Sequence, residues 1–183
     1  MDGAYAPQFF TTRDGRRAAL IALDDVENGS NANGTTVATA SNRDRVARGI
    51  AEARASAEFV LCLMHWGDEN TNSVSARQRA LARWLIDQGV DAVAGCHSHS
   101  IQPLDFYHGR PVVYSLGNLI FDGAPNLKNW KRGQLLEMEI GRSGAKESSL
   151  RLIPVRLDAR GFPQVASGPE EGLASSSTGG DFH

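Results

Sequence analysis

The sequence lacks several features that would place a protein in a class at once. It has only two cysteines in 183 residues, too few for a fold held together by disulfides. It has no apolar run near the length of about 20 residues that a membrane helix needs. Its first residues, Met1 to Ala4, lack the basic start and apolar middle of a signal peptide. We therefore predict a soluble chain without a membrane segment.

The chain also lacks an excess of positive charge. It has 19 Lys and Arg against 21 Asp and Glu, a formal net charge of −2. Binding to a phosphate backbone normally requires a basic surface, so nucleic acid is not expected as a partner. The composition, with 41% hydrophobic and 22% charged residues, is that of a globular protein, and the length suits one domain.

Both cysteines, Cys62 and Cys96, lie in or beside apolar runs. Free cysteine in such a position commonly behaves as a small buried hydrophobic residue, so we expect buried thiols rather than a disulfide. If the two runs form neighbouring strands, the cysteines could still approach each other. The redox compartment stays open.

Histidine is absent from the first 64 residues, and three of the five histidines then follow two apolar runs. Residues 59–64 have the continuous apolar character of a strand buried on both faces, and residues 90–94 repeat it more weakly. His65 follows the first run, and His97 and His99 follow the second.

The segments around these runs predict a β-α-β unit. A capping box and helical spacing predict a helix over residues 42–57. A second helix precedes Gly89 and begins after Asn72, Ser73 or Ser75. Two strands joined through a helix are expected to be parallel, with a right-handed crossover, which places all three histidines at one edge of the sheet.

The rest of the chain predicts further strands and an unstructured end. Strands are expected at residues 18–23, 111–116, 135–140 and 150–157, the last at a sheet edge because apolar residues alternate with basic ones or proline. Residues 1–17 are expected to be an irregular lead-in, and residues 28–34 and 122–132 to be loops. We predict one domain over residues 1–166 and a flexible tail over residues 167–183.

A His-x-His pair with a distant third histidine is a recurring way to hold a transition metal. Neutral imidazole suits zinc, manganese, iron or nickel, and three nitrogen ligands leave positions open for water. Bound water is acidified toward neutral pH, which makes hydrolysis the natural reaction class. His65, His97 and His99 are therefore the candidate ligands. His108 and His183 are not assigned to the site.

Several neighbouring residues have more than one interpretation. The acids Asp68, Glu69, Asp105 and Asp122 are further ligands, partners that orient the imidazoles, or surface residues. Trp66 forms a wall of the pocket or packs in the core. Gly67 and Gly95 allow the backbone to approach a ligand, or serve turn geometry alone. Asn118, after another strand, reaches the crevice as a hydrogen-bond donor or is a turn residue.

Three motifs occur in order along the chain: His65-Trp66-Gly67-Asp68-Glu69, then Gly95-Cys96-His97-Ser98-His99, then Tyr114-Ser115-Leu116-Gly117-Asn118-Leu119-Ile120-Phe121-Asp122. Together they resemble the bacterial capsule synthesis family of the CapA or poly-gamma-glutamate type, which is related to the calcineurin-like metallophosphoesterases. The resemblance implies an α/β fold, a metallophosphatase-like α-β-β-α sandwich with a two-metal site at the sheet edges. It also implies a place in the cell envelope or outside the cytoplasm.

The resemblance further implies roles for the histidines. His97 would share one divalent metal (manganese, zinc or iron) with His65, and His99 would bind a second ion. A metal-bound hydroxide would then attack a phosphorylated or capsule-polymer-related substrate. Trp66, Gly67, Glu69 and Asn118 would support these ligands or contact the substrate.

Family members also carry Gly-Asp, Asn-x-Glu and Asn-Asn-His motifs upstream, and this sequence has none of them. Asp24 and Asp25, after the first expected strand, look too isolated to replace them. We therefore expect a C-terminal portion of the domain, completed by an N-terminal half or by other capsule-synthesis proteins. Two functions follow: a metal-dependent phosphoesterase, or a capsule-assembly or binding module that keeps the fold without catalysis.

Overall fold

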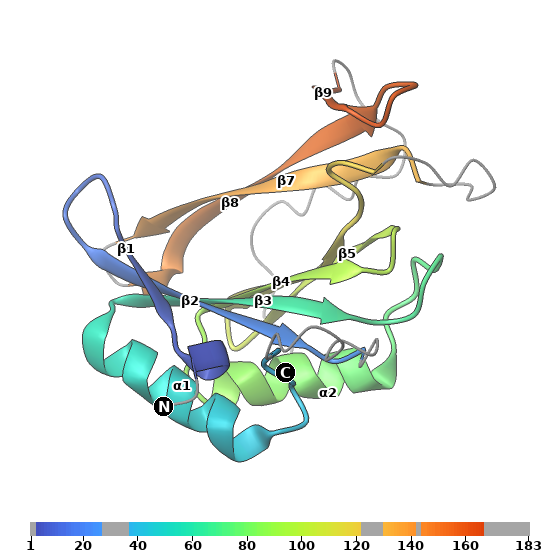
Figure 1. Cartoon of the computed structure of the whole chain (residues 1–183). Coiled ribbons are helices and arrows are strands. Elements are labelled where there is room, and N and C mark those ends of the chain that lie inside the picture. Colours follow the sequence, from blue (N-terminus) through green and yellow to red (C-terminus); the bar gives the residue numbers. More distant parts are fainter. Residues whose placement is uncertain (1–2, 27–36, 122–129, 142–143, 167–183) are drawn as a thin grey trace.

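A six-stranded mixed sheet forms the centre of the molecule (Figure 1). The structure is a computed structural model and describes residues 3–26, 37–121, 130–141 and 144–166. The strand order is β1-β2-β3-β4-β6-β5. The bounds are β1 (Gln8–Thr11), β2 (Arg17–Asp24), β3 (Phe59–Trp66), β4 (Ala92–His97), β5 (Ile101–Tyr107) and β6 (Arg110–Leu116).

The four central strands of this sheet run parallel, and the two edge strands run antiparallel to them. The predicted β-α-β unit is confirmed: β3 and β4 are adjacent and parallel, with a helix between them in the chain. Val60, Cys62 and Met64 alternate along β3 toward the buried core. The apolar run therefore forms a central strand, as predicted, but it is not buried on both faces along its whole length, because Leu63 is 38% exposed.

Both predicted helices are present, α1 (Arg43–Ser56) and α2 (Ala76–Asp87), and a short 3-10 helix, η1 (Gly3–Tyr5), precedes β1. Figure 1 shows α1 and α2 side by side on one face of the sheet. Ile50 of α1 and Leu85 of α2 are fully buried in the core cluster. Each helix begins at a residue whose side chain accepts a backbone N–H of the first turn, Asn42 for α1 and Ser75 for α2.

A second, three-stranded antiparallel sheet, β7-β8-β9, covers the other face (Figure 1). It consists of β7 (Arg132–Gly141), β8 (Gly144–Leu157) and β9 (Pro163–Val165). Met138 of β7 packs against a small buried cluster around Phe59 and Ala92. Helices, large sheet and small sheet thus form successive layers. The α/β, metallophosphatase-like fold class predicted from the sequence is confirmed; a second helical layer is not among the described residues.

Four strands differ from the prediction, among them the short β9, which was not expected. The segment expected to be an irregular lead-in contains β1, which forms a hairpin with β2. Strand β5 was not predicted; it forms a hairpin with β6 through His108 and Gly109, whose positive φ angles of 50° and 70° suit a tight hairpin turn. Strand β8 was expected at an edge but lies between β7 and β9. Pro154 is tolerated there because it lies at the end of the β9 pairing, where its carbonyl accepts the Ala166 N–H.

The cysteines are both free, as expected. Cys62 is buried, whereas Cys96 is exposed, which differs from the prediction of two buried thiols. The predicted tail from residue 167 and most of the two predicted loops lie outside the described residues.

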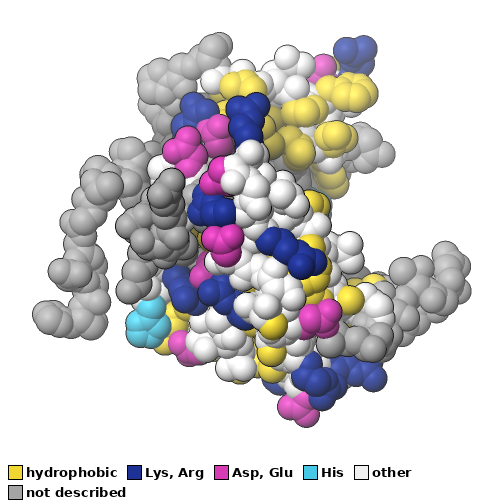
Figure 2. All heavy atoms as spheres, turned by 90° about the vertical axis from the view of Figure 1, so that its left-hand side faces the viewer, with side chains coloured by type: hydrophobic (Ala, Val, Ile, Leu, Met, Phe, Trp, Pro, Cys, Tyr) yellow, Lys and Arg dark blue, Asp and Glu magenta, His cyan; other side chains and the backbone are white. Residues whose placement is uncertain are grey.

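The surface mixes charges and carries some apolar area. In Figure 2, acidic and basic side chains are interspersed, and hydrophobic side chains gather in the upper part, over the small sheet. Phe162 and Val165, next to and within β9, are 52% and 67% exposed. Within the described part of the chain, neither helix has the length and apolar character required to span a membrane.

Candidate metal centre

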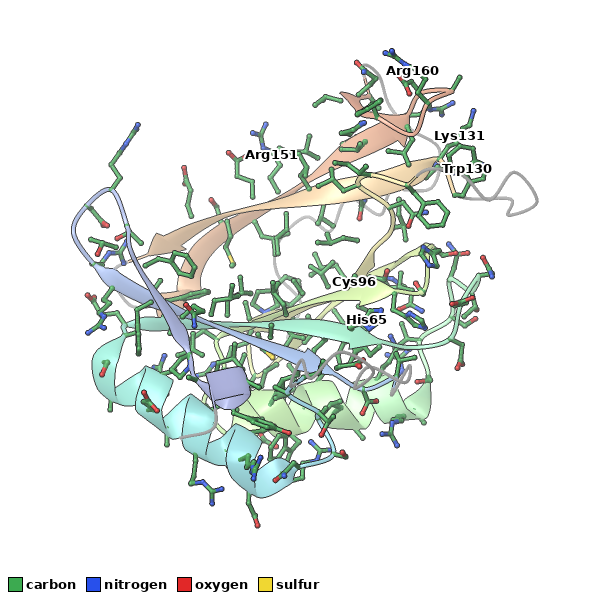
Figure 3. All side chains as sticks on the ribbon, in the orientation of Figure 1. His65, Cys96, Trp130, Lys131, Arg151 and Arg160 are labelled. Carbon is green, nitrogen blue, oxygen red and sulfur yellow. The ribbon has the colours of Figure 1, made fainter. Side chains whose placement is uncertain are left out.

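Neighbouring parallel strands end in polar side chains at one edge of the large sheet. Asp24 closes β2 and stands opposite His65 in the β2-β3 register, while His65 stands opposite Cys96 in the β3-β4 register. His97 ends β4. Figure 3 shows His65 and Cys96 close together at the ends of their strands. Because parallel strands share one carboxyl edge, side chains from distant parts of the sequence meet there.

The three predicted ligands come together at this edge. The rings of His65 and His97 meet edge to face, with 4.5 Å between centroids, and those of His97 and His99 are 6.2 Å apart. The two unassigned histidines do not join them: His108 lies in the β5-β6 turn, 4.0 Å from Asp87, and His183 is outside the described residues.

The backbone at the His-x-His pair is in an unusual conformation. His97 and His99 have φ angles of 97° and 52°, a region that L-residues other than glycine seldom adopt. Between them Ser98 is fully buried; its hydroxyl donates to the Ser100 carbonyl, and its carbonyl accepts from the Asn70 N–H. Such strain persists only where the surroundings fix the chain, and it clusters at functional sites.

Asp24 supports His65, which the sequence did not indicate. Its Oδ1 lies 3.1 Å from Nδ1 of His65 and also accepts the Val26 N–H at 3.0 Å. Asp24 therefore contacts a candidate ligand; whether it replaces a missing upstream motif stays a prediction. The contact joins residues 41 apart in sequence and depends on the β2-β3 register. The sequence offered one signal: the apolar runs over residues 18–23 and 59–64 are followed by an acid and a histidine, which can form a hydrogen bond.

Asn118 supports His99 in a similar way. Its Oδ1 lies 2.8 Å from Nδ1 of His99, and its Nδ2 donates to the Trp130 carbonyl at 2.9 Å. Its main-chain N–H donates to the Arg132 carbonyl at 3.0 Å, so Asn118 also joins the large sheet to the start of β7. Asn118 thus contacts a candidate ligand, but with its acceptor oxygen rather than as the donor expected from the sequence. Its role in supporting a metal ligand or contacting substrate stays a prediction.

The other three predicted site residues lie differently. Trp66 is fully buried in the core, where its indole N–H donates to the Tyr114 carbonyl at 2.7 Å. Gly67 has a φ of +86°, and a Cβ added there would come within 2.7 Å of the Gln78 side chain. Glu69 is exposed. Of these three, Glu69 acts electrostatically on a candidate ligand.

The electrostatics of the cluster favour a neutral imidazole at its centre. Burial lowers the pKa of His97 below its usual value, and the His65 ring lowers it further. Glu69 acts in the opposite direction and raises the pKa of His97. Although Cys96 reaches the surface, partial desolvation of its thiol, followed by the charge of Asp24, raises the pKa of this group. A lowered histidine pKa keeps the lone-pair form that a metal requires.

The donor types fit a divalent metal. Three imidazoles and one carboxylate are ligands that zinc, manganese and iron accept, and the oxygen partners on Nδ1 of His65 and His99 match the way metal-bound histidines are usually oriented. Among the residues that the structure describes, however, no three His, Cys, Asp or Glu side chains are placed so that they could hold one ion. The donors therefore fit a divalent metal in their chemical type.

Aromatic side chains adjoin the cluster on the Asn118 side. The Phe121 ring lies 4.8 Å from that of His99, and Trp130 lies 6.4 Å beyond Phe121, between centroids. Lys131 stands 5.0 Å over the Trp130 ring. Figure 3 shows Trp130 and Lys131 at the end of the small sheet, above the strand ends that carry His65.

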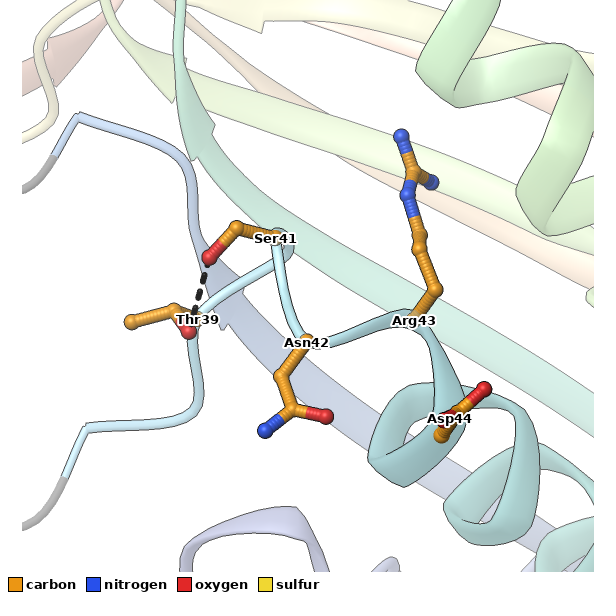
Figure 4. Close-up of a pocket in the computed structure, with 5 residues that line it drawn as sticks. All are labelled: Thr39, Ser41, Asn42, Arg43 and Asp44. Atoms are coloured by element: carbon orange, nitrogen blue, oxygen red, sulfur yellow. Dashed lines mark hydrogen bonds between the residues drawn. The ribbon is translucent and has the colours of Figure 1, made fainter.

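A hollow of about 500 Å³ adjoins the end of β2 on the opposite side. It is lined by Thr39, Ser41, Asn42, Arg43 and Asp44 (Figure 4). Thr39 forms a bridge with Asp24, which places the hollow one strand away from His65. Some of its polar side chains already make hydrogen bonds within the protein. The Ser41 hydroxyl donates to the Thr39 hydroxyl, and the Asn42 side chain caps α1.

Comparison with solved structures supports the fold. The chain superposes on a hypothetical protein from Thermus thermophilus with a TM-score of 0.52 and 12% identity, covering 81% of this chain and 62% of that one. At this identity the likeness concerns the fold alone.

Three curated relatives have names that refer to capsule or polymer synthesis. The PGA biosynthesis protein CapA of Bacillus subtilis is 44% identical over 73 residues, 40% of this chain and 19% of that protein. The capsule biosynthesis protein CapA of Bacillus anthracis is 39% identical over 85 residues, 44% of this chain and 21% of that protein. A probable polyglutamine synthesis accessory protein of Mycobacterium tuberculosis is 26% identical over 138 residues, 73% of this chain and 36% of that protein.

The matched part of the chain thus spans about a fifth of the length of each Bacillus relative. Residues 2–123, which include the three histidines, Asp24 and Asn118, match the family model described as bacterial capsule synthesis protein PGA_cap. This confirms the family inferred from the three sequence motifs. The chain belongs to the PGA_cap family of bacterial capsule synthesis proteins.

Proposed function

We propose that this chain carries part of a metal-dependent phosphoester hydrolase that serves capsule or poly-gamma-glutamate synthesis. The observation that carries the proposal is the cluster of His65, His97 and His99 at one sheet edge, with oxygen atoms of Asp24 and Asn118 on two of the three rings. Manganese, zinc or iron would bind to the three imidazoles.

The protein's own residues would act mainly by placement. Asp24 and Asn118 hold two imidazoles by Nδ1 and leave each Nε2 available for a ligand bond. Burial lowers the pKa of His97 and so favours the neutral form in which this ring can serve as a ligand. A bound divalent ion would acidify a water molecule and so supply hydroxide for hydrolysis.

Metal uptake provides the first test. Equilibrium dialysis with manganese and with zinc is expected to show binding by the wild type and a large loss in His97→Ala. His108→Ala is the matched control, because this exposed histidine lies in the β5-β6 turn and should leave uptake unchanged. Equal and negligible metal uptake by all three proteins would contradict the proposed metal site.

A non-catalytic capsule-assembly or binding module is the second candidate. It is favoured by the placement of the donors, since no three of them among the described residues are positioned to hold one ion. An assay with a chromogenic phosphodiester and added manganese separates the two candidates. Turnover by the wild type that His65→Ala abolishes would contradict the non-catalytic function, and absence of turnover despite metal uptake would support it.

A further inference from the structure

We propose that Asp24 and Asn118 are positioning residues that hold His65 and His99 in the same neutral tautomer. In this tautomer the proton is on Nδ1 and the lone pair is on Nε2. The inference concerns the rings before any metal binds. Its consequence for metal affinity rests on the function proposed above.

The tautomer of His99 follows from the partners of Asn118. An amide side chain offers one acceptor and one donor end, and the hydrogen-bond partners decide which end faces which group. The Trp130 carbonyl can only accept, so the donor Nδ2 faces it at 2.9 Å. Oδ1 is left facing Nδ1 of His99 at 2.8 Å. Because Oδ1 can only accept, Nδ1 of His99 must carry the proton.

Asn118 is held firmly enough to impose this choice. It is only 7% exposed, and its main-chain N–H donates to the Arg132 carbonyl. A Cβ added at Gly133 would lie 2.0 Å from the Asn118 carbonyl oxygen, which shows how closely β7 approaches it. Turning the amide over would place its oxygen against the Trp130 carbonyl and leave two part-buried oxygen atoms without a donor, which is unfavourable.

The tautomer of His65 follows from Asp24. An ionised carboxylate has no proton to donate, so Nδ1 of His65 donates to Oδ1 across 3.1 Å. The backbone on both sides of this carboxylate is fixed: the Asp24 N–H donates to the Ala38 carbonyl, and the Asp24 carbonyl accepts from Ala40. The next peptide is also tied to β3, since the Asp25 N–H donates to the His65 carbonyl.

These two contacts reverse the ordinary preference of the imidazole ring. Neutral histidine in water carries its proton mainly on Nε2, so the Nδ1–H form has to be imposed by an acceptor. The same form leaves Nε2 free as a donor atom for a metal. His97 makes no side-chain hydrogen bond to any residue in the described ranges, so neither Asp24 nor Asn118 fixes its tautomer through such a bond.

The tautomers can be read directly by NMR. Long-range proton–nitrogen spectra of the histidine side chains distinguish Nδ1–H from Nε2–H in the ¹⁵N-labelled, metal-free protein at an alkaline pH where the rings are neutral. The expected result is Nδ1–H for His65 and His99. Asn118→Leu should shift only His99 toward Nε2–H, and Asp24→Leu should shift only His65, so each variant serves as the folding control for the other.

A conservative variant separates positioning from mere packing. Asn118→Asp keeps an acceptor toward His99 and should retain the Nδ1–H form, although it sets a carboxylate oxygen against the Trp130 carbonyl. A purely structural role predicts that Asn118→Asp and Asn118→Leu leave the His99 signals equally changed or equally unchanged. Finding Nε2–H for His99 or His65 in the wild type, or no tautomer change in either leucine variant, overturns the inference.

Zinc titration completes the test. Loss of the groups that orient metal-bound histidines typically weakens metal affinity by about 10- to 100-fold, and this loss is expected for Asn118→Leu and Asp24→Leu. If the wild type shows Nδ1–H at both rings but binds no zinc, the proposed function fails and the tautomer assignment stands. If the wild type binds zinc and both leucine variants bind it equally well, the positioning role fails and the metal site stands.

Discussion

At the scale of single residues, the two cysteines show how strand alternation separates chemically identical groups. Cys62 of β3 is fully buried in the core cluster beneath the helices. Cys96 stands opposite His65 in the β3-β4 register, on the edge that carries the candidate ligands, and is exposed. Because successive side chains of a strand point to opposite faces, neighbouring strands can hold two thiols that do not meet.

The buried thiol predicts a specific dependence of stability on pH. Burial raises the pKa of Cys62 from 9.0 to about 12, so the folded protein keeps this proton above pH 9 while the unfolded chain loses it. The unfolding free energy should therefore fall as pH rises through this range, by about 1.4 kcal/mol per pH unit from this group alone. Urea unfolding of the wild type and of Cys62→Ala at about pH 8 and about pH 10 measures the effect. Parallel pH profiles of the two proteins would contradict it.

At the scale of elements, the start of α2 shows why one of several polar residues caps a helix. The sequence did not decide which of Asn72, Ser73 and Ser75 caps this helix. Ser75 is the cap because its hydroxyl accepts the Gln78 N–H and the Gln78 side chain accepts the Ser75 N–H. Gln78 is itself buried and donates to Gln102 of β5, so the reciprocal cap is fixed by tertiary contacts.

Removing the hydroxyl of this cap should destabilise the protein measurably. Ser75→Ala leaves the Gln78 N–H without its acceptor and is expected to lower the unfolding free energy by about 1 kcal/mol. Ser73→Ala is the matched control, since the Ser73 side chain makes no hydrogen bond to any described residue. Urea unfolding followed by far-UV circular dichroism compares the two. An equal stability for both variants would mean that the capping bond contributes nothing.

At the scale of the whole molecule, the two sheets join through a short junction next to the candidate site. Gly117 and Gly133 form an isolated antiparallel bridge, and Asn118 donates to Arg132 beside it. The approach is so close that only glycine fits at position 133. The placement of the small sheet is thereby coupled to Asn118 and, through it, to His99.

Gly133→Ala tests this junction. The added Cβ would lie 2.0 Å from the Asn118 carbonyl oxygen, so backbone must shift, and overpacking of this kind costs about 3 kcal/mol. We expect a lower unfolding free energy together with a changed His99 signal in the NMR experiment. Gly3→Ala, where an added Cβ meets nothing within 4 Å, is the control and should leave both readouts unchanged. A Gly133→Ala protein of wild-type stability would show that the junction can adjust freely.

The sequence by itself determined the helices and strands that can be recognised from residues only a few positions apart. The apolar run over residues 59–64, the helical spacing over residues 42–57 and the stop at Gly89 predicted β3, α1 and the end of α2. Because a β-α-β unit has parallel strands, the meeting of the three histidines at one edge followed as well. The motifs around them identified the family, which the match over residues 2–123 confirms.

Only the tertiary structure decided which residues support those histidines and where the short strands lie. The contact of Asp24 with His65 depends on the β2-β3 register, and the bond of Asn118 to Trp130 depends on how β7 approaches β6. Strands β1 and β9 are too short for a side-chain period to identify them and exist through pairing with longer partners. The physical reason is range: periodicity and caps involve residues a few positions apart, whereas hydrogen bonds between strand ends depend on distances set by packing of the whole chain.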